Sequence, residues 1–106
     1  MTHIHPARWK GFSKGKLADH YKKHGKEFGS ISQIEYLKKA KEFAAESGPF
    51  EQIQIGNMFI RYDPDTGRVF TGNISDREIR TFYIADKRGT DAFEDAVRTA
   101  EEIVGK

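Results

Sequence analysis

The sequence contains no cysteine, which excludes disulfide bonds, zinc–thiolate sites and catalysis by a thiol. It has no apolar run near the ~18–20 residues that a membrane-spanning helix needs, and its start lacks the apolar stretch of a signal peptide. With only three prolines and no biased tract, collagen, coiled-coil and solenoid folds are also excluded. The 106 residues, 12% of them aromatic, suffice for one modest core, so we expect a single domain spanning 1–106.

The net charge of +2 is small, but it is unevenly distributed. Residues 1–48 hold ten Lys or Arg against five acidic residues, whereas 49–84 hold four against five and 85–106 hold four against six. This asymmetry indicates one basic surface, for which a polyanion is the natural partner. The alternative is a lysine-rich helix face that only contacts solvent.

The N-terminal segment begins with an irregular stretch and continues as a short helix. We interpret residues 1–12 as a leading arm anchored by Trp9 and Phe12. After this arm, apolar and aromatic residues recur every three or four positions, which predicts a helix. These residues are Leu17, His20, Tyr21, His24 and Phe28. Gly25 is expected to end this helix in a left-handed backbone conformation.

A second helix completes the helical part, residues 13–48. Ser32 and Glu35 have the spacing of a capping box, and Ile31 and Tyr36 that of a hydrophobic staple. The residues expected to form its buried stripe are Ile34, Leu37, Ala40, Phe43 and Ala44.

From residue 50 to residue 84 the apolar period changes to two, which is typical of strands. Pro and Gly within Asp63–Gly67 predict a tight hairpin turn. Residues 90–104 regain a helical period and predict a C-terminal helix. The order is therefore two N-terminal helices, a twisted antiparallel sheet of three or four strands and a C-terminal helix. This order predicts an α+β domain with its helices packed on one face of the sheet.

Two histidines one helical turn apart form the first candidate site. Histidine titrates near neutrality, so His20 and His24 could divide the roles of general base and general acid. A metal site is disfavoured because Lys22 and Lys23 lie between them, and no nearby carboxylate completes a ligand set. The alternative is that both histidines merely pack a helix.

The strand at residues 79–84 is the second candidate. Its alternation would send Ile79, Thr81 and Tyr83 to one face and Arg80, Phe82 and Ile84 to the other. Thr81 and Tyr83 would then project together about 6.6–7 Å apart, close to the span of a phosphodiester with a neighbouring sugar or base. The alternative is that both are ordinary strand-forming residues.

Together these motifs resemble a known family. The segments His20–Gly29 and Ser32–Leu37 resemble the first-helix signature of colicin-D-like ribonuclease toxins, and Arg61–Gly67 and Ile79–Tyr83 resemble the hairpin and final catalytic strand of that family. Such domains are the C-terminal effectors of colicins, contact-dependent inhibition proteins and other polymorphic bacterial toxins. The resemblance covers roughly residues 16–84.

The resemblance implies a fold of the barnase and colicin type and metal-independent cleavage of transfer RNA. His24 stands where the family has its catalytic histidine, Lys23 at a neighbouring basic position, and Thr81 and Tyr83 at the hydroxyl and aromatic positions. Tyr21 stands where a member of the family has a lysine, so that role is unfilled or passes to His20 or Lys22.

The residue chemistry then allows a mechanism without any cofactor. One histidine would take the proton of a ribose 2′-OH, whose oxygen attacks the adjacent phosphorus and leaves a 2′,3′-cyclic phosphate, while another group protonates the departing 5′ oxygen. Lys23, and Arg80 or Arg61, would stabilise charge on the phosphoryl oxygens. The expected catalytic residues are His20, Lys23, His24, Thr81 and Tyr83, and the expected substrate-binding residues are Lys22, Lys26, Arg61 and Arg80.

The resemblance also implies partners and a place of action. We expect a monomer with no membrane span, neutralised by an acidic immunity protein, delivered as the C-terminal part of a larger carrier and active in the bacterial cytoplasm. Two other functions stay open: a non-catalytic nucleic-acid-binding module, and an interaction domain of a phage or mobile element.

Overall fold

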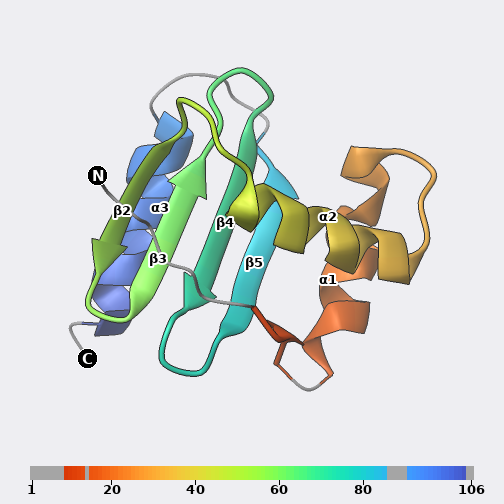
Figure 1. Cartoon of the computed structure of the whole chain (residues 1–106), viewed down its shortest axis with the longest axis horizontal. Helices are drawn as coiled ribbons and strands as arrows, with labels where there is room; N and C mark the ends of the chain where they lie inside the picture. Colours follow the sequence, from red (N-terminus) through yellow and green to blue (C-terminus); the bar gives the residue numbers. More distant parts are fainter. Residues whose placement is uncertain (1–8, 14, 86–90, 105–106) are drawn as a thin grey trace.

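The computed structural model describes residues 9–13, 15–85 and 91–104, which form an α+β arrangement (Figure 1). The helices are α1 (Lys16–His24), the short 3₁₀ helix η1 (Gly25–Phe28), α2 (Gln33–Ala45) and α3 (Asp91–Val104). The strands are β1 (Gly11–Phe12), β2 (Glu51–Ile55), β3 (Met58–Tyr62), β4 (Arg68–Asn73) and β5 (Glu78–Ile84). The predicted α+β class and C-terminal helix are confirmed, although position 90 lies outside the described residues. Among the helices described, none is long and apolar enough to cross a membrane.

The sheet is mixed, with the strand order β1-β5-β4-β3-β2. Strands β2 to β5 form the expected antiparallel meander, but β1 pairs in parallel with β5, with Gly11 opposite Glu78. The prediction of a purely antiparallel sheet of three or four strands was therefore wrong, as was the assignment of all of residues 1–12 to an arm. A two-residue strand has no period, and its partner is distant in the chain, so no local pattern reveals the pairing.

The anchoring role predicted for Trp9 and Phe12 is confirmed, while residues 1–8 of the expected arm lie outside the described residues. Trp9 is only 9% exposed, and its ring meets the edge of Phe70 with centroids 5.2 Å apart. It also lies directly over Gly72, where a Cβ atom would come within 2.5 Å of the indole. Glycine at this position therefore makes room for the tryptophan.

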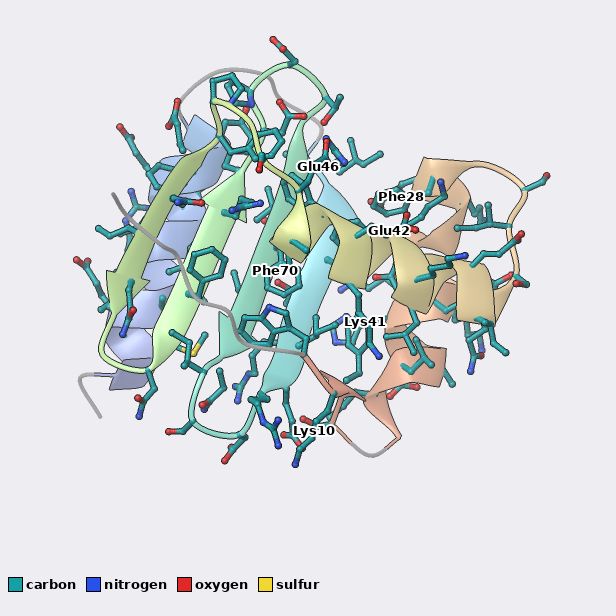
Figure 2. All side chains as sticks on the ribbon, viewed as in Figure 1. Lys10, Phe28, Lys41, Glu42, Glu46 and Phe70 are labelled. Atoms are coloured by element: carbon teal, nitrogen blue, oxygen red, sulfur yellow. The ribbon has the colours of Figure 1, made fainter. Side chains whose placement is uncertain are left out.

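Helices cover both faces of the sheet, so the prediction of helices on one face only was wrong. On one face Tyr36, Ala40 and Phe43 of α2 pack with Phe70, labelled in Figure 2, and Phe82. On the other face Ala96 and Ala100 of α3 pack with Ile60, Tyr62 and Val69. All five residues of β3 are buried. A strand buried on both sides requires cover on both sides, and α3 supplies the second layer.

The start of α2 is formed as predicted, but its buried stripe is shifted. The Ser32 hydroxyl accepts from the backbone N–H of Glu35 at 3.1 Å, and the Glu35 carboxylate accepts from that of Ser32 at 2.8 Å. This capping box is confirmed. Ile34, expected in the stripe, is 75% exposed, because it lies two positions from Tyr36 and so about 200° around the helix.

The β3–β4 hairpin turn is also confirmed. The Asp63 carboxylate accepts hydrogen bonds from the backbone N–H of Asp65 and the hydroxyl of Thr66, and Gly67 has a left-handed φ of 84°. Burial alone would raise the pKa of Asp63, but these bonds and the Arg68 guanidinium at 2.8 Å outweigh it and lower the pKa.

An irregularity in β5 changes which residues share a face. Thr71 pairs with Thr81, but the next residue of β4, Gly72, pairs with Ile79, so Arg80 is the extra residue of a bulge. The predicted regular alternation was therefore wrong at its start. Ile79 and Phe82 face α2, whereas Thr81 and Tyr83 face the side that α3 covers.

Helix α1 lies beyond the β5 edge of the meander (Figure 1), tied to the core by Tyr21. The Tyr21 hydroxyl donates to the backbone carbonyl of Ile31 at 2.6 Å. Gly25 has a right-handed helical conformation, with φ −54°, so the predicted left-handed end of the helix was wrong. The chain instead continues into η1. Glycine is needed there because a Cβ atom would lie 2.7 Å from the Tyr21 ring. The left-handed turn comes at Gly29, where φ is 104°.

Candidate active site

A cleft of about 450 Å³ opens between α1 and α3 on the face of the sheet that α3 covers. In Figure 1, α3 lies behind β2 and β3, whereas α1 lies beyond β5. The residues that line the cleft include Lys16 and His20 from α1, Arg80, Thr81 and Tyr83 from β5, and Asp95 from α3. Its size is within the ~300–1,000 Å³ range of small-molecule sites.

Two hydroxyl groups lie on the floor of the cleft. The Oγ1 atoms of Thr71 and Thr81 are 2.8 Å apart, and either can donate to the other. A hydroxyl has one donor hydrogen and two acceptor lone pairs. If Thr71 donates, Thr81 keeps its own hydrogen for a bound anion, so the pair can present one polar hydrogen to the cleft.

Tyr83, two residues beyond Thr81 on β5, lines the same cleft and is half-buried. Burial raises the pKa of its phenol, and the nearby carboxylates of Asp95 and Glu27 raise the pKa further. The phenol therefore stays neutral at physiological pH. It can donate a hydrogen bond, and its ring can stack on a base.

His20 contributes the imidazole that lines the cleft. Its ring stacks on Phe12, with centroids 5.1 Å apart. Burial is the main cause that lowers the pKa of His20, and the positive charges of His24, Lys16 and Lys23 lower it further. A lowered pKa keeps this imidazole neutral near pH 7, which is the form that can accept a proton.

His24 lies one turn further along α1, beside Tyr83 rather than in the lining of the cleft. Its ring centroid is 6.2 Å from that of His20 and 5.4 Å from that of Tyr83. Its Nδ1 atom is 2.9 Å from a carboxylate oxygen of Glu27. Both histidines, Tyr83 and the carboxylate of Glu27 therefore form one continuous cluster.

The basic residues predicted to bind substrate or, in the case of Lys23, to act in catalysis do not form one group. Arg80 lines the cleft, together with Lys16. Lys22 and Lys26 instead line a separate, open depression of about 730 Å³. Lys23 is exposed and belongs to neither lining, although its charge acts on His20. A polyanion that touched every one of these cations would have to pass around α1.

Arg61, also predicted to bind substrate, is a buried structural residue with only 6% of its surface exposed. Its guanidinium donates to the backbone carbonyls of Phe43 and Glu46 at 2.8 and 2.6 Å and to the side chain of Gln52 at 3.0 Å. Burial lowers its pKa. The group ties the end of α2 to β3, and its Nε and Nη1 atoms already donate to protein acceptors.

Sequence reasoning missed Lys16, Glu27 and Asp95. Lys16 stands four positions before His20 and Glu27 three positions after His24, so helical spacing could have placed both beside the histidines. No local signal could have found Asp95, because only the packing of α3 brings it to the cleft. Within the described ranges, no group of three or more His, Asp or Glu side chains is arranged to hold a metal ion.

Comparison with known proteins adds no independent identification. No protein-family model matches the chain, and a search of curated proteins found no similar sequence. The resemblance to colicin-D-like ribonucleases therefore rests on the motifs themselves and stays a prediction.

Proposed function

We propose that this protein is an endoribonuclease that cleaves transfer RNA by attack of a ribose 2′-OH, without a metal ion. The observation that carries the proposal is the cleft between α1 and α3, which combines a neutral imidazole (His20), a polar hydroxyl (Thr81), a phenol (Tyr83) and cationic side chains. These are the groups that transfer of a phosphoryl group between two oxygens of RNA requires.

In the proposed reaction His20 acts as the general base, because its lowered pKa keeps it neutral. It takes the proton of the 2′-OH, and the 2′ oxygen forms a bond to the adjacent phosphorus. The bond from phosphorus to the 5′ oxygen breaks, and the products are a 2′,3′-cyclic phosphate and a 5′-hydroxyl end. His24, paired with the Glu27 carboxylate, is suited to give the departing oxygen its proton.

The remaining groups would bind the phosphate and the base. Lys16 and Arg80 provide positive charge for the phosphoryl oxygens, and the Thr81 hydroxyl donates to one of them. Tyr83 stacks on or orients a base of an unpaired loop. Because the nucleophile is the 2′-OH, DNA is not a substrate.

The finer expectations of the resemblance belong to the same proposal. They are a barnase and colicin type of fold, a role as a bacterial toxin domain delivered by a larger carrier into the cytoplasm of a target cell, and an acidic immunity protein that covers the cleft. The charge of residues 1–48, ten basic against five acidic, supports an acidic inhibitor, because opposite charges steer association.

The test is single-turnover cleavage of total transfer RNA in EDTA. We expect the wild type to cleave, and His20→Ala, His24→Ala and Thr81→Ala to lose about 10²–10⁴-fold in rate, as expected for removal of an acid, a base or an oxyanion donor. Lys38→Ala is the matched control, since Lys38 is an exposed residue of α2 outside the cleft.

Two outcomes would overturn the proposal. Full activity in both histidine variants would exclude the acid–base scheme, and equal cleavage of an all-deoxy substrate would exclude 2′-OH attack. Salt-dependent binding of RNA that survives every substitution, with no cleavage by the wild type, would instead identify a binding module.

A further inference from the structure

Glu27 uses both oxygens of its carboxylate to join two parts of the candidate site. One oxygen, Oε2, is 2.9 Å from Nδ1 of His24. The other, Oε1, accepts the backbone N–H of Ile84 at 2.8 Å, at the end of β5. A single side chain in η1 thus connects the imidazole of α1 to the strand that carries Thr81 and Tyr83.

This geometry determines which nitrogen of His24 can exchange a proton. An ionised carboxylate only accepts hydrogen bonds, so the proton of neutral His24 must reside on Nδ1. Among the described residues, Nε2 has no hydrogen-bond partner. The neighbouring rings of His20 and Tyr83, with centroids 6.2 and 5.4 Å away, restrict the tilt of the imidazole.

We propose that Glu27 is a positioning residue: it holds His24 in the Nδ1–H tautomer, docks it against β5 and so reserves Nε2 for proton exchange with the substrate. The inference rests on the proposed function only in its last clause, the exchange with substrate. The tautomer and the docking are properties of the free protein.

Glutamine at this position discriminates between positioning and simple packing. Glu27→Gln has nearly the same shape but only one accepting oxygen. If that oxygen keeps the Ile84 N–H, the amide NH₂ faces Nδ1 of His24, which must then accept, and the imidazole proton moves to Nε2. The substitution should therefore reverse the tautomer while leaving the fold in place.

The experiment is ¹⁵N–¹H NMR of the imidazole groups at a pH where His24 is neutral. We expect the proton on Nδ1 in the wild type and on Nε2 in Glu27→Gln. Glu42→Gln, an exposed residue of α2 labelled in Figure 2, is the matched control and should leave the tautomer unchanged. Glu27→Asp, which keeps an accepting carboxylate, should retain the Nδ1 proton. An unchanged tautomer in Glu27→Gln would overturn the proposal.

Single-turnover cleavage separates this inference from the proposed function. Glu27→Gln should be slower by at least about tenfold, part of the ~10²–10⁴-fold that a general acid or base contributes, and Glu27→Asp should recover some of the loss. If the wild type cleaves and Glu27→Gln cleaves equally with an unchanged tautomer, the inference fails and the function stands. If the tautomer changes but the wild type cleaves no RNA, the function fails and the positioning stands.

Discussion

Replacing Arg61 by alanine should destabilise the fold and leave the candidate active site intact. The guanidinium donates three hydrogen bonds, two of them to backbone carbonyls at the end of α2. It also lies over the rings of Phe50, Phe59 and Phe43, at 5.1, 5.7 and 5.8 Å from their centroids. Alanine would leave those carbonyls without their donor and open a cavity among the rings.

The expected loss follows from the number of bonds and the burial of the group. A hydrogen bond from a charged donor is worth about 1.5–3 kcal/mol, but such contributions are not additive, and removal of a buried charge relieves its own desolvation cost. We therefore expect a net loss of about 3 kcal/mol, which for a domain of this size lowers Tm by about 12 °C or more.

Urea denaturation followed by circular dichroism measures this loss, and the cleavage assay measures the site. Arg61→Lys keeps the charge but not the planar fork and should fall between the wild type and alanine. Arg80→Ala is the contrasting control: Arg80 is exposed and lines the cleft, so cleavage should fall with little change in stability. A loss below about 1 kcal/mol in Arg61→Ala, or a stable Arg61→Ala that no longer cleaves, would refute the structural assignment.

The structure makes two further predictions about stability. Gly72→Ala would bring a Cβ atom within 2.5 Å of the Trp9 ring, so we expect a loss of about 1–3 kcal/mol in urea denaturation and a changed tryptophan emission; an unaltered midpoint would contradict the packing described. Burial and then the charge of Glu27 raise the pKa of Tyr36 above its ordinary value, so the folded state holds this proton more tightly and stability should fall as pH rises through about 10. Tyr36→Phe removes the hydroxyl that donates to the Phe82 carbonyl, and should cost about 1–2 kcal/mol at neutral pH while flattening the alkaline decline; an equally steep decline in Tyr36→Phe would exclude Tyr36 as its cause.

Features set by neighbouring residues in the chain could be predicted from the sequence. The capping box of Ser32 and Glu35 and the turn at Asp63 depend on contacts within a few residues, and both are present. The left-handed conformation predicted for Gly25 was wrong, although the contact that requires glycine there, with Tyr21, is local. The sequence shows that glycine is present, but not whether a positive φ or a lack of space requires it. The β1 strand and the helices on both faces of the sheet were not predicted, because each depends on partners that are distant in the chain.

The same distinction between local and distant contacts applies to the residues of the candidate site. Helical spacing brings His20 and His24 together, and strand spacing aligns Thr81 and Tyr83, so these pairs could be predicted. Composition alone cannot separate an arginine that binds phosphate from one that closes a helix end, and Arg61 proved to be the second kind. The bulge at Arg80 likewise depends on its partner strand β4, which its own segment does not reveal.

The pairing of β1 with β5 has a consequence for the order in which the molecule assembles. It joins Gly11 to Glu78 and thereby closes a loop that contains every element from α1 to β4, which carries a larger entropic cost than any hairpin of the meander. We expect the meander to form first and the β1–β5 pair last, an order that the single tryptophan, Trp9, can report in stopped-flow refolding beside circular dichroism. Coincident signals would contradict it. Because α1 follows β1 directly, the cleft between α1 and α3 is complete only when this last contact forms. Chains that have folded only the meander carry no assembled site.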